Sequence, residues 1–235
     1  MGIDERSRAD EIAAANPEIA IFGIGAIEQH GRHLPIGTDW FAASEIARLS
    51  AIELNALLIP SIPYSMSECH GLMPGTVWLK PATLAAVLRD VVVSLRDQGI
   101  HKVLVINGHG GNFILEPVIQ AFNHDFPDMR VVMPSEVWAT SDENPPLFET
   151  SEVHAGEGET STQLYLNPGD VKPGGVDFIP TVGREFLDYV FIQQINPEGV
   201  WGQPSYGNVA KGGRAIAAQV RKVVDFAQRA FKVLR

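Results

Sequence analysis

Three short segments of this chain combine histidine with carboxylate side chains, the groups that bind divalent metals. The first segment follows the apolar stretch 19–25 and contains Glu28, His30 and Asp39. Glu28 and His30 are two positions apart, so in extended backbone their side chains leave on one face. Asp39 can return to the same space from the start of the next expected helix. Carboxylate with imidazole suits Zn, Mn or Fe, and the alternative is a solvated polar loop with a capping aspartate.

The second segment is the glycine-rich turn 107–112, with His109 at its centre. It follows another buried apolar stretch, 101–107, so His109 should reach the same edge of the sheet as the first segment. An alternative stays open here, because glycine-rich turns before helices also expose N–H groups to phosphate. A histidine in the middle of the turn fits metal ligation better.

The third segment, residues 154–161, places His154 beside the carboxylates of Glu157 and Glu159. A glutamate in the first turn of a helix is also simply stabilising, which accounts for either carboxylate but not for His154. Five ligands from three loops suffice for two metals that share one carboxylate, and Asp39 is the central candidate for sharing. Two metals about 3.5–4 Å apart lower the pKa of a bridging water and polarise the bond that it attacks. We expect His154 to protonate the leaving nitrogen or to orient the substrate.

An alternation of strands and helices must position these segments. Hydrophobic patterning predicts strands at 19–25, 56–62, 101–107 and 129–134, and helices at 39–54 after a Thr38/Asp39 cap, at 81–98, from about 113, at 158–167 and at 212–234. Such alternation predicts an α/β fold with a parallel sheet covered by helices on both faces. The polar stretch 135–153 is expected to be a long loop that could act as a lid. Nothing demands a domain boundary, so residues 1–235 are expected to form a single domain.

Composition limits the possible partners. Hydrophobic residues make up 45% and charged residues 20% of the chain, which is ordinary for a globular protein. No apolar run approaches the roughly 20 residues that span a bilayer, so we expect a soluble protein without a membrane partner. A net charge of -10 makes nucleic acid an unsuitable partner. The charged N-terminal segment and the single cysteine, Cys69, favour the cytoplasm.

In combination, these segments resemble the creatininase family from about residue 19 to the last helix. Residues 28–35 match its Glu-x-His-Gly-x-His-Leu-Pro motif, and His30 and Asp39 keep its spacing of nine positions. Four further motifs of the family follow in the same order as in the family. These motifs are His-x-x-x-Pro-Gly-Thr (His70 to Thr76), the Asn-Gly-His loop (107–109), His-x-Gly-x-x-Glu-Thr-Ser (His154 to Ser161) and Gly-x-x-Gly-x-Pro (199–204).

The resemblance implies a three-layer αβα sandwich with a mostly parallel central sheet, a dinuclear Zn or Mn site and commonly a homohexamer. Creatininase itself carries Tyr-Glu after the loop histidine and uses that glutamate as a metal ligand, whereas this chain has Gly110 and Gly111. We therefore take Glu159 as the fifth ligand and expect it to act in catalysis beside His154. Glu157 is the alternative for that position.

The resemblance also implies the type of reaction, which is hydrolysis of a cyclic amide, a formamide or a related C–N bond of a small molecule. Creatininase packs its substrate against a tryptophan four positions before the catalytic histidine, where this chain has Thr150. The Gly-Gly version of the loop is more similar to relatives that deformylate a flavin-type cofactor precursor, cleave a cofactor precursor peptide or hydrolyse oxidised inositols. A cyclic ketone and a precursor peptide are therefore alternative substrates.

Several further residues are expected to contact the substrate or to support the ligands. His70 and Thr76 belong to a family motif, and Trp138 opens the irregular stretch 135–153. We expect these three residues to bind substrate. His33 and Asn107 are expected to support the metal ligands from behind.

Two single motifs allow a different chemistry, a nucleotide-binding glycine pair and a cysteine nucleophile. A nucleotide-binding protein could use Gly23 and Gly25, but Glu28 stands where the third glycine of that fingerprint belongs and would repel a pyrophosphate. Cys69 could be a nucleophile beside His70, but adjacent residues in a strand point to opposite faces, and a lone cysteine is usually a small buried hydrophobe. Both interpretations account for fewer of the clustered residues than a metal site does.

Overall fold

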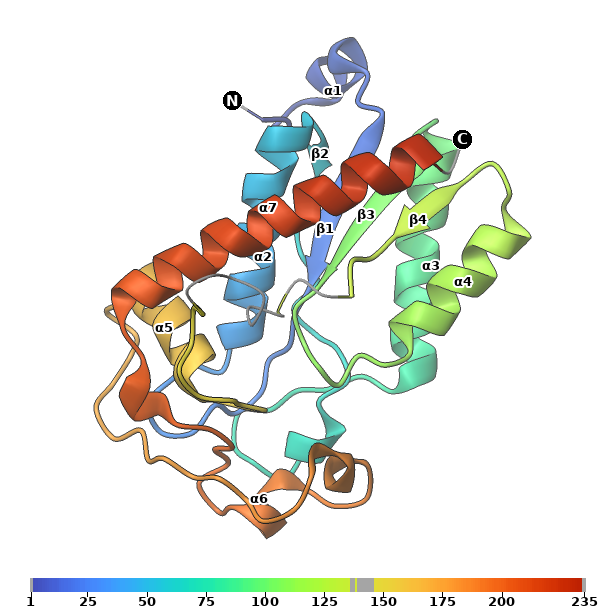
Figure 1. Ribbon diagram of the computed structural model, residues 1–235. Coiled ribbons are helices and arrows are strands. Elements are labelled where there is room, and N and C mark those ends of the chain that lie inside the picture. Colours follow the sequence, from blue (N-terminus) through green and yellow to red (C-terminus); the bar gives the residue numbers. More distant parts are fainter. Residues whose placement is uncertain (1, 136–137, 139–145, 234–235) are drawn as a thin grey trace.

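Four parallel strands form the centre of the computed structural model, which describes residues 2–135, 138 and 146–233 (Figure 1). Within these residues the strand order is β2-β1-β3-β4, and the strands are β1 (Ile19–Ile24), β2 (Leu57–Leu58), β3 (Lys102–Asn107) and β4 (Arg130–Val132). The helices are α1 (Ala9–Ala15), α2 (Thr38–Leu54), α3 (Pro81–Asp97), α4 (Leu115–Asp125), α5 (Glu157–Leu166), α6 (Ile192–Ile195) and α7 (Val209–Val233), with short 3-10 turns η1 (Glu68–His70), η2 (Arg184–Asp188) and η3 (Pro204–Tyr206).

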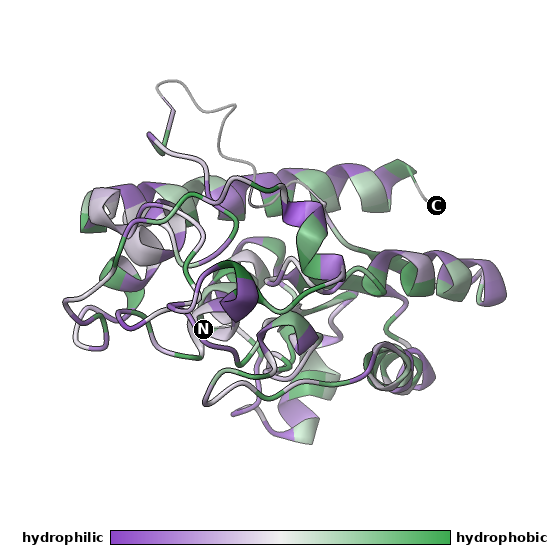
Figure 2. Cartoon of the chain, turned by 90° about the horizontal axis from the view of Figure 1, so that it is seen from below, coloured by the Kyte–Doolittle hydropathy of each residue, from purple (hydrophilic) through white to green (hydrophobic). Residues whose placement is uncertain are grey.

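Helices cover both faces of this sheet, as the alternation of buried residues requires. Phe22 and Val105 face one way and pack in a core with residues of α3 and α4. Ile21 and Leu104 face the other way and pack in a second core with residues of α2 and α7. Hydrophilic and hydrophobic residues alternate along these helices, as expected when one side of each is buried (Figure 2). The prediction of an αβα sandwich with a parallel sheet is confirmed.

The register of the two central strands determines where the chemistry lies. β1 and β3 pair along their whole length, from Ile19 opposite Lys102 to Ile24 opposite Asn107. Both strands therefore end at the same level, and the loops that follow them begin side by side at one edge of the sheet. In an open parallel sheet this edge is where ligands bind.

The predicted second strand is shorter than the stretch 56–62. Only Leu57 and Leu58 form regular strand, although Ile62 still makes an isolated bridge to Ile24. Between the pair Ile21–Leu58 and the bridge Ile24–Ile62 the register shifts by one residue, so the strand is irregular around Pro60. The other predicted strands and helices are present, with ends shifted by a few residues.

The predicted cap of the second helix is also wrong in its position. Gly37 is the capping residue, and Thr38 and Asp39 already lie inside the first turn of α2. The Thr38 hydroxyl donates a hydrogen bond to the Pro35 carbonyl at 2.7 Å, so it closes the preceding loop and leaves the helix end uncapped by a side chain.

Two sequence expectations concern segments away from the sheet. Part of the predicted lid 135–153, namely residues 136–137 and 139–145, lies outside the described residues. Among the helices that the structure describes, none is both long and apolar enough to cross a membrane.

Candidate metal centre

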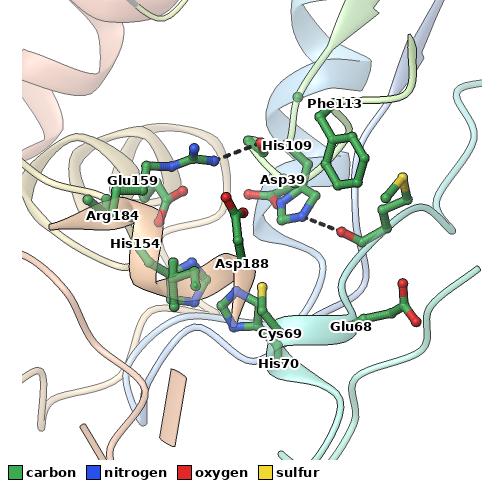
Figure 3. Close-up of a pocket in the computed structure, with 16 residues that line it drawn as sticks. Asp39, Glu68, Cys69, His70, His109, Phe113, His154, Glu159, Arg184 and Asp188 are labelled. Atoms are coloured by element: carbon green, nitrogen blue, oxygen red, sulfur yellow. Dashed lines mark hydrogen bonds and ion pairs between the residues drawn. The ribbon is translucent and has the colours of Figure 1, made fainter. Parts of the chain in front are cut away.

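The side chains predicted as metal ligands lie close together at the carboxyl edge of the sheet. Glu28 and His30 come from the loop after β1, and Asp39 comes from the first turn of α2. His109 comes from the turn after β3, and Glu159 from the first turn of α5. Glu28 and His30 are completely buried, while Asp39, His109 and Glu159 line a cavity of about 550 Å³ (Figure 3).

Asp39 lies between two imidazole rings. Its Oδ1 is 3.1 Å from Nε2 of His30, and its Oδ2 is 2.9 Å from Nδ1 of His109. Burial alone would raise the pKa of Asp39, but the two histidines hold it well below its usual range. Each carboxylate oxygen therefore faces a different potential ligand, as in a carboxylate that two cations share.

Glu28 lacks the hydrogen bonds that a buried carboxylate requires. The side chain is completely buried, yet neither carboxylate oxygen accepts a hydrogen bond from the described residues. Its Oε2 lies 3.3 Å from Nε2 of His109, and burial raises the pKa of Glu28 to about 7. One atom each from Glu28, Asp39 and His109 lies within 4.8 Å of the others, so this set can hold a cation. A divalent cation would satisfy the carboxylate, and these residues therefore fit a metal.

A second set of possible ligands adjoins the first. His30, His154 and Glu159 also offer atoms within 4.8 Å of one another. Nε2 of His30 lies 3.6 Å from Oε2 of Glu159. Burial opposes protonation of His30, but Glu159 and Asp39 outweigh it and raise the pKa of this ring well above its usual value. Asp39 belongs to the first set and also lies beside His30 of the second, with its Oδ1 3.1 Å from Nε2 of that ring.

The two neighbouring glutamates of α5 have different environments. Glu157 is buried and forms a 2.5 Å ion pair with Lys211. It also accepts hydrogen bonds from the main chain of Glu149 and Thr150. Glu159 has 28% of its side chain exposed and faces the cavity beside His30. Glu157 is thus occupied by protein partners, while Glu159 faces the other candidate ligands.

The two remaining histidines of the cluster lie next to Glu28. His154 lines the cavity, and burial together with His30 lowers its pKa to about 4. His70 is 3% exposed, and its Nε2 is 3.6 Å from Oε1 of Glu28. Burial and the neighbouring histidines lower the pKa of His70 well below its usual value.

The amide of Gln29 lies between His70 and His154, in contact with both. Sequence reasoning did not single out this residue. Its neighbours in the chain, Glu28 and His30, carried the metal pattern, and a lone glutamine between them gave no signal of its own.

The short 3-10 turn η2 contributes cavity residues that the sequence did not indicate. Arg184 and Asp188 both line the cavity, and Nη2 of Arg184 donates a 2.8 Å hydrogen bond to the carbonyl of Gly110 (Figure 3). Cys69 lines the same cavity, but burial raises the pKa of its thiol to about 12. A thiol that stays protonated is a poor nucleophile.

Thr76 and Trp138, both predicted to bind substrate, lie in different places. Within the described residues Thr76 is outside the cavity lining, and its hydroxyl accepts a 3.1 Å hydrogen bond from the main-chain N–H of Gln29. Trp138 lines a smaller cavity of about 260 Å³ that shares Asp39 and Glu159 with the first.

The residues predicted to support the ligands contact the loops that carry them. Nε2 of His33 lies 3.1 Å from the hydroxyl of Thr160, which is the residue after Glu159. The side-chain oxygen of Asn107 accepts a 3.2 Å hydrogen bond from the main-chain N–H of His109. His33 and Asn107 therefore contact the segments that carry Glu159 and His109.

Comparison with known proteins gives a consistent result. The sequence profile of the creatininase family, described as creatinine amidohydrolase, matches residues 5–227. A mycofactocin precursor peptide peptidase from Mycobacterium tuberculosis is 28% identical over 227 residues, which cover 90% of this chain and 85% of the relative. A 3-dehydro-scyllo-inosose hydrolase from Thermotoga maritima is 29% identical over 159 residues, which cover 64% of this chain and 51% of the relative.

The solved structure of a variant creatininase described as Zn-Zn type superposes with a TM-score of 0.85 at 21% identity, covering 97% of this chain and 98% of the other. Solved creatininases carry Zn or Mn, and this chain has clusters of residues that can hold such ions. Because the profile matches almost the whole sequence and the fold agrees from end to end, the chain belongs to the creatininase family and is a hydrolase.

Proposed function

We propose that this protein hydrolyses a C–N bond of a small molecule, such as a cyclic amide or a formamide, with two divalent metal ions. The metal ligands would be Glu28, His30, Asp39, His109 and Glu159. The observation that carries the proposal is the position of Asp39, whose two oxygens face His30 and His109 separately. A carboxylate in that position can be shared between two cations.

Zn, Mn and Fe all suit this mixture of imidazole and carboxylate. One ion would lie among Glu28, Asp39 and His109, and the other among His30, Asp39 and Glu159. When bound, a pair of such ions lowers the pKa of water and polarises the bond under attack.

His154 would move the proton that hydrolysis of a C–N bond requires. Its lowered pKa keeps the ring neutral near pH 7, so it can accept a proton from the attacking water. The same ring can then give the proton to the leaving nitrogen. Glu159 lies on the same wall of the cavity, where it would contact the attacking water as well as a metal.

The cavity volume of about 550 Å³ supports a small-molecule substrate. The relatives leave two alternatives for its class, since one is named for a precursor peptide and the other for an oxidised inositol. A cyclic ketone or a peptide bond in a cofactor precursor would use the same attacking water.

We further propose that residues 1–235 work as one hydrolase domain in a cytoplasmic homohexamer. The family match over residues 5–227 supports a single domain. Sedimentation equilibrium of the purified protein tests the assembly, and a monomeric mass would contradict it.

The function is tested by a screen of the metal-loaded enzyme against lactams, formamides, short peptides and cyclic ketones. We expect hydrolysis of one class, loss of turnover after chelation and recovery when Zn or Mn is returned. Turnover that a chelator leaves intact would contradict the proposal. Tight binding of NAD or ATP by metal-free protein would favour the nucleotide-binding interpretation.

A further inference from the structure

The buried side-chain amide of Gln29 has only one orientation that its described neighbours permit. Its Oε1 accepts a 3.0 Å hydrogen bond from the N–H of Gly31, and its Nε2 donates a 3.0 Å hydrogen bond to the carbonyl of Gly199. Exchanging the oxygen and nitrogen would place two acceptors together at Gly199 and two donors together at Gly31. The two main-chain groups therefore fix the orientation of the amide.

The main-chain carbonyl of Gln29 determines the tautomer of His154. Nε2 of His154 lies 2.6 Å from the main-chain carbonyl of Gln29, which can only accept, so this nitrogen carries a proton. The same nitrogen therefore cannot accept a hydrogen bond from the Gln29 amide, 3.1 Å away. A neutral His154 has its lone pair on Nδ1, which lies 3.5 Å from Oε1 of Glu28.

The tautomer of His70 follows from the amide proton that remains. One amide proton is used by Gly199, and the acceptor left for the other is Nδ1 of His70, 2.9 Å from the amide nitrogen. A neutral imidazole that accepts at Nδ1 carries its proton at Nε2. That Nε2 lies 3.6 Å from Oε1 of Glu28, on the same side of the cluster as the free nitrogen of His154.

The two rings therefore present opposite functions on the side where both lie beside Oε1 of Glu28. Their centroids are 4.3 Å apart, and both residues line the cavity next to the candidate metal ligands (Figure 3). His70 offers an N–H and His154 offers a lone pair. A hydrolase that attacks a carbonyl needs both, a donor for the oxygen that gains charge and an acceptor for the proton of water.

We propose that Gln29 is a positioning residue that makes His70 the hydrogen-bond donor to the substrate's carbonyl oxygen and His154 the proton acceptor. The inference rests on the proposed hydrolysis of a C–N bond. As the oxygen of water bonds to the carbonyl carbon, the carbonyl oxygen gains negative charge and receives the N–H of His70, which keeps its proton. The proton of water moves to Nδ1 of His154 and then to the nitrogen as the C–N bond breaks.

The backbone around Gln29 is built to hold the amide in place. Gln29 is 5% exposed, and its main-chain N–H donates a hydrogen bond to the hydroxyl of Thr76. Gly199 has a φ of +70°, and a Cβ there would lie only 2.1 Å from Oε1 of Gln29. Glycine at position 199 thus leaves the space that the amide fills, so Gly199→Ala should displace the amide without removing any polar group.

The direct test is the tautomer of each ring in the zinc-loaded protein labelled with ¹⁵N-histidine. The imidazole ¹⁵N shifts should show a proton at Nε2 and a bare Nδ1 for His70 and for His154. In Gln29→Met and in Gly199→Ala we expect His70 to lose its single Nε2–H tautomer. A proton on Nδ1 of His70 in the unaltered protein, or unchanged shifts in both variants, would overturn the inference.

A kinetic test uses the substrate found in the screen. Removing a donor to the developing oxyanion should lower kcat by about 10²- to 10³-fold in Gln29→Met and in His70→Phe, with KM and zinc content changing far less. His70→Gln should recover part of the loss, because its amide can again donate an N–H. Wild-type kcat in His70→Phe would overturn the role of His70.

Gln163→Met is the matched control, because Gln163 is a buried glutamine whose amide also donates to a main-chain carbonyl, that of Thr38 at 3.1 Å. It should leave the ¹⁵N shifts of both histidines and kcat unchanged. Lack of hydrolysis by the unaltered protein would contradict the proposed function. The tautomers can be measured in that case too, because the ¹⁵N experiment needs no substrate. An unchanged kcat in His70→Phe would overturn this inference and leave the proposed function standing.

Discussion

Oδ2 of Asp39 lies 2.9 Å from Nδ1 of His109, although the two residues are 70 positions apart in the sequence. The contact arises because β1 and β3 pair in register along their whole length, so the loops after them begin at the same edge of the sheet. The other oxygen of Asp39 faces His30 at 3.1 Å. Asp39 thus lies between two candidate ligands that come from different loops.

Asp39→Ala should remove metal and activity together, because it takes away the group common to both candidate cation positions. Elemental analysis of the variant measures the metal, and the substrate assay measures kcat. Asp10→Ala, a change of an exposed aspartate in α1, serves as the control and should keep both. Full metal content in Asp39→Ala would refute the shared position.

Glu159→Gln should lower the metal content and activity, because this carboxylate faces His30 at the second candidate position. The matched variant is Glu157→Gln, which should keep its metal. Elemental analysis of both variants distinguishes the two glutamates. Loss of metal from Glu157→Gln with retention in Glu159→Gln would reverse the assignment.

Glu157→Gln should instead lower the free energy of unfolding by about 2 kcal/mol, the usual worth of a hydrogen bond to a charged group. The loss arises because the variant weakens the bonds to Lys211 and to the main chain of Thr150. Urea unfolding measures it. An unfolding free energy equal to that of the unaltered protein would show that this buried pair contributes nothing to stability.

Metal affinity should rise with pH up to about pH 9. In the metal-free protein burial opposes protonation of His109, but Glu28 and Asp39 raise its pKa to about 9. A metal must displace that proton to bind the neutral ring, so between the pKa of Glu28, about 7, and that of His109 each pH unit gained should strengthen binding by about tenfold. Titration of apoprotein with zinc against a competing chelator measures the slope. Affinity that does not change between about pH 6 and about pH 8 would contradict this prediction.

Arg184→Gln should weaken binding of substrates that carry a carboxylate. Among the described residues that line the main cavity, Arg184 is the only lysine or arginine. We expect KM to rise about tenfold for a carboxylate-bearing substrate, the cost of one charged hydrogen bond, and to change little for its neutral amide. Arg32→Gln is a control, because Arg32 pairs with Glu198 and does not line that cavity within the described chain. Equal effects on both substrates would show that Arg184 does not select for charge.

Cys69→Ala should keep kcat within a few-fold of the unaltered enzyme. Burial raises the thiol pKa to about 12, so at neutral pH the side chain is not a thiolate. The same pKa predicts slow reaction with a thiol-alkylating reagent. Complete inactivation of the unaltered enzyme by that reagent, with activity insensitive to chelators, would instead identify a cysteine nucleophile.

The sequence predicted the parts of this site that depend on regular elements. Glu28 and His109 follow buried strands, and the ends of parallel strands share one edge of the sheet, so their convergence could be expected from the apolar runs alone. Asp39 could be predicted as a ligand because it lies at the start of a helix that follows the same loop. The role of Glu157 could not be predicted from the sequence, because its ion-pair partner, Lys211, is 54 positions away in the chain.

Irregular segments escaped prediction for a physical reason. Arg184 and Asp188 lie in a stretch rich in glycine and proline, where no hydrophobic period indicates which side chains turn inward. Gln29 acts through contacts to His70 and to the main chain of Gly199, which are 41 and 170 positions away. Such contacts are set by loop conformations that local patterns do not specify.

The most direct test of the central claim is the amount of metal bound to each chain. Elemental analysis of the protein purified without added metal, and again after reconstitution with Zn or Mn, should approach about two ions per chain. Fewer than about one ion per chain after reconstitution would contradict a dinuclear centre built on Glu28, His30, Asp39, His109 and Glu159.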